Sequence, residues 1–241
     1  MFRYAGACLG PGSFLLYSYI MSLPIWARNI LFLLVYMISG LILAIIIDGL
    51  LSGSDLLPLN TAIEGVMVAI RTPWLTNFMV TITTIANPFL FGVVAVCLAV
   101  TLILKKERYK AALFLTALIV TVISLTVLKN VLQISRPVSD IYNVEGWSFP
   151  SGHTTLATAF FFLLSYTFFG KMKTTQGKAW LIATSFIGVF LAAFSRLYLG
   201  AHWALDVLAG TALGLLSVSF TVLIFNLILG EGRSFRRKID L

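Results

Sequence analysis

In the stretch from Lys129 to Asp206, three short polar segments interrupt an otherwise apolar sequence, and the rest of the chain is organised around them. They are KNVLQISRP at residues 129–137, PSGH at 150–153 and SRLYLGAHWALD at 195–206. The chain has only two histidines, and both lie in these segments beside arginine, serine or aspartate. Imidazole groups with such partners at helix ends are typical of acid–base chemistry on a phosphate.

The composition places the chain in a membrane. It has 59% hydrophobic and 11% charged residues, whereas an average soluble domain has roughly 25% charged residues. So few charges do not cover the surface of a globular protein in water. The net charge of +8 is typical of cytoplasmic loops that meet anionic lipid headgroups. No basic stripe is interleaved with exposed aromatic residues, so nucleic acid is not expected as a partner.

Six charge-free runs have the length of a membrane-spanning helix. Crossing the hydrocarbon core takes about 20 residues, with a range of roughly 17 to 25. The runs are residues 29–47, 88–104, 111–128, 154–170, 179–195 and 207–230. We therefore predict an all-α integral membrane protein, a bundle of six transmembrane helices.

The six runs are expected to form one domain over residues 29–230. Residues 1–28 contain a charge-free stretch that glycines and prolines interrupt, so we expect an interfacial segment there rather than a full span. That region also lacks the compact apolar centre and small-residue cleavage site of a signal peptide. Residues 231–241 mix acidic and basic side chains and are expected to form a cytoplasmic tail in contact with lipid headgroups.

A further uncharged segment, residues 72–86, precedes the second run. Pro73 interrupts its start, and the Asn87-Pro88 pair follows its end. We predict that this segment is a helix or a re-entrant segment on the membrane surface.

The loops differ in charge, and the difference predicts the orientation. Short loops rich in Lys and Arg stay in the cytoplasm. One set of alternate loops holds 13 of the 17 basic residues, namely Arg3, Arg28, Lys105, Lys106, Arg108, Lys110, Lys171, Lys173, Lys178, Arg233, Arg236, Arg237 and Lys238. The opposite set holds six of the nine acids, namely Asp48, Asp55, Glu64, Asp140, Glu145 and Asp206. Both termini are therefore predicted to be cytoplasmic.

Alternation of the six helices brings the polar segments together. Lys129 follows the third run and His153 precedes the fourth, while Arg196 follows the fifth and His202 precedes the sixth. All of these positions fall on the non-cytoplasmic face. The sequence thus predicts that four helix ends converge on one site at the periplasmic or extracellular side of the membrane.

Three of the cations on that face, Lys129, Arg136 and Arg196, belong to the polar segments. A basic side chain at a membrane boundary is costly to bury without an anionic partner. A lone one commonly extends to the lipid headgroups instead, but that explains three cations beside two histidines poorly. A phosphate, whose several oxygens suit guanidinium and ammonium groups, explains them better.

The segment Pro150-Ser151-Gly152-His153 is expected to open the fourth helix. Ser151 is a candidate N-cap, and Gly152 allows a ligand to approach the backbone. The free N–H groups of a helix start favour an anion. A Ser-Gly pair alone is ordinary loop sequence, and its significance comes from His153, which follows directly.

His202 and Asp206 are four residues apart, so in a helix they would lie on one face. A structural hydrogen bond between them is the plainest interpretation. A metal site is disfavoured, because no further ligands have suitable spacing and the neighbouring cations would repel a metal ion. Next to an anion-binding cluster, a neutral imidazole held by a carboxylate suits a nucleophile. His202 would then attack phosphorus, and His153 would protonate the departing alcohol.

The three segments, in this order and with these spacings, resemble the signature of the type 2 phosphatidic acid phosphatase (PAP2) superfamily. That superfamily also includes vanadium haloperoxidases and glucose-6-phosphatase. All signature positions are present, and the resemblance covers roughly residues 74–226. It implies six transmembrane helices, hydrolysis without a metal or cofactor, and a phosphohistidine intermediate.

The resemblance also implies a role for each signature residue. His202 is similar to the nucleophile, Asp206 to the carboxylate that orients it and His153 to the general acid. The residues similar to the groups that bind the phosphoryl oxygens are Lys129, Arg136, Ser151, Gly152 and Arg196. Such a preorganised cationic clamp stabilises a phosphoryl group in transfer, so no metal is expected.

The sequence therefore predicts a phosphatase that removes the terminal phosphate of a membrane lipid at the outer face of a bacterial-type inner membrane. Candidate substrates are an undecaprenyl diphosphate, phosphatidylglycerophosphate, phosphatidic acid and a lipid A phosphate, and the motifs do not rank them. A site at the membrane boundary favours a lipid-anchored substrate. Residues 72–88, Trp147 and Trp203 are expected to line an entrance for its tails.

Three alternatives remain open. In the first alternative, the phosphoryl group passes to another lipid instead of to water. In the second, the protein is a transporter or lipid-binding protein whose intramembrane charges form a pathway, although the polar residues cluster at helix ends on one face. The third is haloperoxidase chemistry, which embedding in a membrane disfavours; vanadate is expected to act only as an inhibitor.

Overall fold

The computed structural model describes residues 25–53, 57–142 and 144–230, and within them every regular element is helical. In chain order these elements are α2 (Ile25–Ser52), α3 (Leu57–Ala69), α4 (Pro73–Ile85), α5 (Pro88–Leu104), α6 (Arg108–Leu132), α7 (Gly152–Phe168), the 3₁₀ helix η1 (Phe169–Lys171), α8 (Thr175–Tyr198) and α9 (Ala204–Gly230). The all-α prediction is confirmed. The proposed tail at 231–241 and most of the interfacial segment at 1–28 lie outside the described residues. Residues 25–28 belong to α2.

The structure supports four to five of the six predicted spans. Helices α2, α6, α8 and α9 are long and apolar enough to cross a membrane. Helices α4 and α5 meet at a bend of 44°, and together they would make a fifth span. Helix α7 has 17 residues, which is about 25 Å at 1.5 Å per residue.

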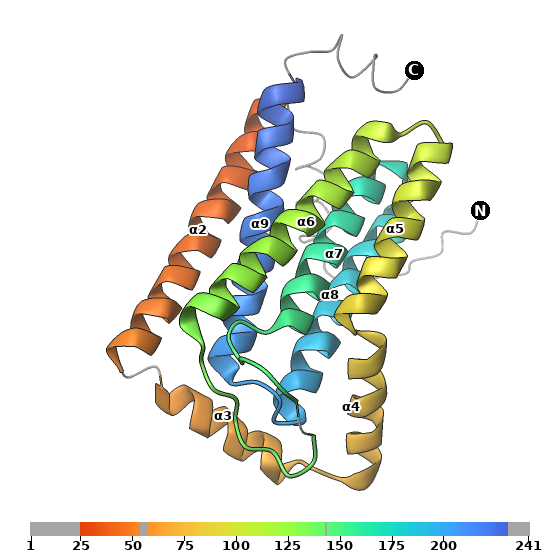
Figure 1. Ribbon diagram of the computed structural model, residues 1–241. Helices are drawn as coiled ribbons and strands as arrows, with labels where there is room; N and C mark the ends of the chain where they lie inside the picture. The colour runs from red at the N-terminus through yellow and green to blue at the C-terminus, as the bar shows by residue number, and fades with distance from the viewer. Residues whose placement is uncertain (1–24, 54–56, 143, 231–241) are drawn as a thin grey trace, which may run out of the picture.

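Helix α4 confirms the helix expected at residues 72–86, and its place at the membrane surface stays a prediction. It begins as predicted, with Thr72 as N-cap and Pro73 in the first turn; the Thr72 hydroxyl accepts a hydrogen bond from Leu75 N. It then runs into α5 and packs beside α8 (Figure 1). Asn87 caps α5 by accepting a hydrogen bond from Phe89 N at 2.8 Å. Pro88 at the start of α5 therefore separates α5 from α4 within one line of apolar residues.

Helix α3 was not predicted. It lies across one end of the bundle, against α8 and α9 (Figure 1). Its Asn60 is buried, and the Asn60 side-chain oxygen accepts a hydrogen bond from Leu205 N at 3.0 Å. This bond satisfies a free N–H group in the first turn of α9. Helix α3 thus supports the start of α9, next to His202.

Helix α7 forms the centre of the bundle and packs against α9, α8, α6 and α5 (Figure 1). Two glycines let α9 come close to it. A Cβ at Gly210 would lie 2.8 Å from the carbonyl oxygen of Ser151, and one at Gly214 would lie 2.7 Å from that of Thr155. Larger residues would push α9 away, so these glycines fix the start of α7 beside the start of α9.

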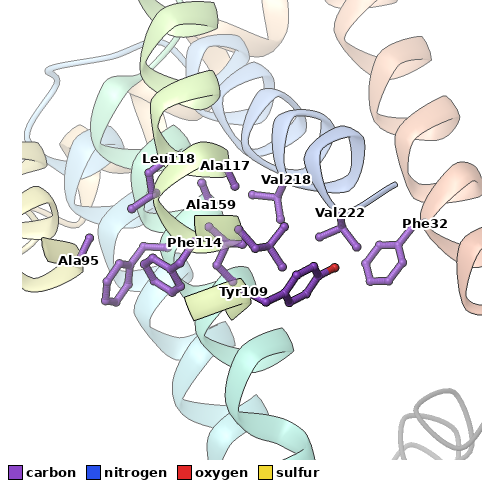
Figure 2. Close-up of a cluster of buried hydrophobic side chains, with 12 residues drawn as sticks. Phe32, Ala95, Tyr109, Phe114, Ala117, Leu118, Ala159, Val218 and Val222 are labelled. Atoms are coloured by element: carbon purple, nitrogen blue, oxygen red, sulfur yellow. The ribbon is translucent and has the colours of Figure 1, made fainter. Parts of the chain in front are cut away.

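Figure 2 shows a cluster of buried apolar side chains from several helices. Its members on α6 lie in the first half of that helix, away from the loop that joins α6 to α7. Phe114 of α6 meets Phe160 of α7 edge to face, with ring centroids 5.8 Å apart. Phe32 from α2 and Val222 from α9 close the other side of the cluster. This packing leaves the opposite end of the bundle for the polar residues.

Candidate active site

His202 lies in the turn between α8 and α9. The chain reverses at Gly200, whose φ of 65° favours glycine, and α9 begins only at Ala204. The helical spacing that linked His202 to Asp206 in the sequence is therefore not the reason for their contact. Instead the carboxylate of Asp206 reaches back from the first turn of α9. Its Oδ2 lies 3.3 Å from His202 Nδ1 and accepts a hydrogen bond from Trp203 N at 2.9 Å.

Ser148, which no sequence motif predicted, joins this pair. Its buried hydroxyl donates a hydrogen bond to Asp206 Oδ2 and lies 3.3 Å from His202 Nδ1. A carboxylate at Nδ1 favours the tautomer that carries the proton there. His202 Nε2 then bears the lone pair, and Arg136 Nη1 lies 3.1 Å from it.

Arg136 and Lys129 hold the loop that carries Ser148. Arg136 donates to the carbonyl oxygens of Gly146, Trp147 and Ala201 at 2.8–3.1 Å. Lys129, in the last turn of α6, donates to the carbonyl oxygens of Trp147 and Ser148 at 2.7 and 3.2 Å. Neither cation has a carboxylate within ion-pair distance in the described part of the chain.

Arg196 approaches the same site from the end of α8 and is only 1% exposed. Its Nη1 donates a hydrogen bond of 2.6 Å to Thr83 Oγ1, and its guanidinium lies 5.3 Å from the ring centroid of Tyr142. Its Nε has no hydrogen-bond partner among the described residues. A buried N–H group without a partner is costly, so this guanidinium has capacity for a further acceptor.

His153 is the second residue of α7, and its ring lies beside the backbone carbonyl of Thr83. Thr83 of α4 therefore contacts both His153 and Arg196. The sequence motifs do not include Thr83, Tyr142 or Ser148. Thr83 lies on α4, and Tyr142 and Ser148 lie in the loop between α6 and α7. Their contacts with the motif residues are therefore visible only in the folded chain.

Ser151 occupies the predicted N-cap of α7, but its hydroxyl does not cap the helix. The hydroxyl lies 3.1 Å from Thr154 Oγ1, while Ser151 N donates to the carbonyl oxygen of Asp206 at 3.0 Å. A Cβ on Gly152 would meet Leu125 at 3.5 Å, which is an ordinary contact. Crowding by protein atoms therefore does not require the glycine.

The site favours a neutral His202. Burial lowers the pKa of His202 well below its usual value, and the cations Arg136, Arg196 and Lys129 lower it further. A neutral imidazole keeps a lone pair, which is the form a nucleophile needs. In the described residues, no three His, Cys, Asp or Glu side chains are grouped to hold a metal ion.

All eight predicted site residues lie at one end of the bundle, on the ends of α6, α7, α8 and α9 and the loops between them. Hydrogen bonds join Lys129 and Arg136 to the Ser148 loop, and Arg136 contacts His202 directly. Thr83 links Arg196 to His153. The predicted convergence of four helix ends is therefore observed, while the roles of the residues stay predictions.

Comparison with known proteins adds independent information. The model of the PAP2 superfamily matches residues 110–228. The chain is 32% identical to phosphatidylglycerophosphatase B of Bacillus subtilis over 165 residues, which is 65% of this chain and 78% of the relative. It is 29% identical to an undecaprenyl-diphosphatase of Sulfolobus acidocaldarius over 123 residues, which is 48% of this chain and 55% of that relative.

Solved structures show the same fold. A transmembrane PAP2-type phosphatidylglycerolphosphate phosphatase from Bacillus subtilis matches with a TM-score of 0.70 at 23% identity, over 82% of this chain and 96% of the other. LpxE from Aquifex aeolicus matches with a TM-score of 0.55 at 24% identity, over 68% of this chain and 94% of the other. The fold, the polar segments and the relatives agree with the resemblance that the sequence showed. The chain belongs to the PAP2 superfamily and is a multi-pass membrane phosphatase.

Proposed function

We propose that this phosphatase hydrolyses the terminal phosphate of a lipid phosphate or lipid diphosphate through a phosphohistidine at His202. One observation carries the proposal. The lone pair of His202 Nε2 faces Arg136, within a cluster of three cations that have no carboxylate at ion-pair distance among the described residues. A nucleophile and an unneutralised anion clamp at one point suit phosphoryl transfer.

In the first step His202 Nε2 attacks phosphorus, and the bond from phosphorus to the lipid oxygen breaks. His153 donates a proton to that oxygen, so the lipid leaves as an alcohol or a monophosphate. Asp206 and Ser148 keep the proton of His202 on Nδ1 and stabilise the imidazole as it becomes positive. In the second step His153 takes a proton from water, which attacks the phosphohistidine and releases phosphate.

The charge on the phosphoryl oxygens is held by Lys129, Arg136 and Arg196. The backbone N–H groups at the start of α7, at Gly152 and His153, add the partial positive charge of a helix start. Ser151 is assigned to the phosphate site with them, although its hydroxyl now contacts Thr154. Three fixed cations supply the charge stabilisation that other phosphoryl-transfer enzymes take from Mg²⁺.

The substrate is proposed to be anchored in the membrane. Trp147 is 41% exposed beside the site, and the Trp203 ring donates to the carbonyl oxygen of Ser135 at 3.0 Å. Amphipathic rings of this kind favour the boundary between lipid and water. The named relatives are a phosphatidylglycerophosphatase and an undecaprenyl-diphosphatase, so those two lipid classes lead the candidates, with phosphatidic acid and lipid A phosphates behind them.

The topology belongs to the same proposal. Helices α4 and α5 together form the second span and α7 forms the fourth, which gives six spans and both termini in the cytoplasm. The loops 105–110 and 171–178 support this orientation, because they hold seven cations and one acid. The contact of Lys171 with Glu107 shows that these loops lie at one end. The active site then faces the periplasm or the outside of the cell.

The test is phosphate release by the purified protein from a panel of the four lipid classes in detergent, with EDTA present. We expect one or two lipids to release free phosphate at rates that EDTA does not change. Loss of the lipid phosphate without free phosphate would indicate transfer to another lipid. No reaction with any lipid, or a strict metal requirement, would contradict the proposal.

A further inference from the structure

Thr83 is the one residue of α4 that reaches two proposed catalytic groups at once. It is 1% exposed. Its hydroxyl accepts the 2.6 Å hydrogen bond from Arg196 Nη1, and its backbone carbonyl lies beside the ring of His153. The side chain thus contacts a phosphate-binding cation, while the main chain contacts the proposed general acid.

The carbonyl of Thr83 can accept a hydrogen bond from another element because α4 ends at Ile85, two residues later. In a continuous helix, the carbonyl of residue 83 would accept from the N–H of Asn87, four residues later. The carbonyl of Thr84 would need the N–H of residue 88, which is Pro88 and has none. Asn87 N donates to the Thr84 carbonyl instead, at 3.3 Å. The Thr83 carbonyl is therefore left for His153.

The hydroxyl of Thr83 has one defined partner, the guanidinium of Arg196. The guanidinium of Arg196 is buried, its Nε has no partner among the described residues, and Tyr142 covers one face of it. Thr83 Oγ1 is the side-chain acceptor that fixes the direction of Nη1. The hydroxyls of Thr81 and Thr84 on the same helix donate instead to carbonyls of α4, at 3.0 and 2.8 Å, and face away from the site.

We propose that Thr83 is a positioning residue of this phosphatase, whose hydroxyl aims Arg196 at the phosphate and whose carbonyl, freed by the break at Pro88, aims His153 at the leaving oxygen. The inference rests on the proposed function. It makes the bend between α4 and α5 a part of the active site, and it gives the segment before the second predicted span a role outside the sequence motifs.

The hydroxyl is tested with Thr83→Val, which keeps the β-branched shape and the carbonyl. Thr83→Ser restores the hydroxyl, and Thr84→Val makes the same chemical change one residue away without touching the site. Orthovanadate binding is measured by calorimetry in detergent, and KM by phosphate release. We expect Thr83→Val to weaken vanadate binding by about tenfold and to raise KM, because a buried guanidinium loses an acceptor. Thr83→Ser and Thr84→Val are expected to match the wild type.

The carbonyl is tested with Pro88→Ala, which supplies the missing N–H to the Thr84 carbonyl. Asn87 N can then return to the Thr83 carbonyl and compete with His153. We expect kcat to fall while vanadate binding stays unchanged. Pro73→Ala, at the start of α4, is the matched control and is expected to keep kcat. Thermal unfolding and circular dichroism check that each variant folds.

The outcomes separate this inference from the function itself. If the wild type releases no phosphate from any lipid, the proposed function fails, and the vanadate series still decides whether Thr83 orients Arg196. If the wild type is active but Thr83→Val binds vanadate as tightly as Thr84→Val, the role of the hydroxyl is wrong. A folded Pro88→Ala variant with wild-type kcat overturns the role of the carbonyl.

Discussion

The two ends of the helix bundle differ in the partners of their basic side chains. At the far end, Glu107 precedes α6 and pairs with Lys110 at 2.8 Å and with Lys171 from η1. At the site end, Lys129, Arg136 and Arg196 meet carbonyls, a hydroxyl and a histidine, but no carboxylate at ion-pair distance in the described chain. Among the acids at that end, Asp206 is the one that contacts His202, and its Oδ2 is taken by Ser148, His202 and Trp203.

The charged side chains at the two ends also differ in burial. Glu107 and Lys171 keep 28% and 30% of their side chains exposed, so water screens their charges and their pairing stabilises the fold only slightly. Arg196 is 1% exposed, and a buried unpaired cation is costly. At the far end, exposed cations are screened by water and two of them also have Glu107 as a partner. At the site end, the buried cations lack such a partner among the described residues, and we propose that the phosphoryl group of the substrate is the anion that they bind.

The largest effect is expected from removing the proposed nucleophile. His202→Ala should lower phosphate release by about a thousandfold or more, since the proposed covalent intermediate forms on this imidazole. Phosphate release and circular dichroism of the same sample measure activity and folding together. A folded His202→Ala protein with full activity would sink the assignment.

A cation removed from each end tests the comparison directly. Arg196→Gln should lower kcat/KM by about a hundredfold, because a preorganised group that holds the phosphoryl charge is lost. Lys171→Gln, the matched change at the far end, should leave kcat/KM near that of the wild type. Equal losses in the two variants would mean that the ends do not differ in the way proposed.

A smaller effect follows from the lowered pKa of His202. Burial and the neighbouring cations keep folded His202 neutral, whereas the unfolded chain binds a proton near pH 6.5. Below about pH 6.5 the unfolded state therefore binds more protons than the folded state. The free energy of unfolding is highest above that pH and decreases as the pH falls. The Tm of the wild type should fall more steeply between pH 7.5 and 5.5 than that of His202→Ala. Parallel curves would argue against a neutral buried imidazole.

The smallest effect is expected at Glu107. Burial raises its pKa, but hydrogen bonds from Lys110 and Lys171 outweigh this, and the pKa lies below its usual value. Its contribution is therefore present above pH 4.5 and lost as the pH falls through the lowered pKa. Glu107→Gln should cost about 0.5 kcal/mol of stability and leave phosphate release unchanged. A large loss of activity would show that the far end is coupled to the site.

The sequence predicted which polar residues gather at one end of the bundle better than it predicted the helices around them. Motif spacing and loop charges, both local features, placed Lys129, His153, Arg196 and His202 at one end. Helix α3 was missed because its 13 residues are too few to span a membrane and carry no motif.

Contacts between distant residues explain what the motifs left out. Thr83 meets Arg196 across 113 positions, and Ser148 meets Asp206 across 58. A threonine in an apolar helix and a serine in a loop are common, and only packing shows which of them faces a charge. The helical argument for His202 and Asp206 found the right pair for the wrong reason, because His202 precedes the helix.

Trapping the phosphohistidine is the most direct test of the proposed role of His202. A lipid substrate labelled with ³²P in its terminal phosphate is mixed with the wild type and quenched in alkali within the first turnover, and the labelled peptide is identified. We predict label on His202 that survives alkali and is released by acid, as phosphohistidine requires, and none on His202→Ala. An unlabelled wild-type protein during active turnover, or label that persists in His202→Ala, would contradict the account.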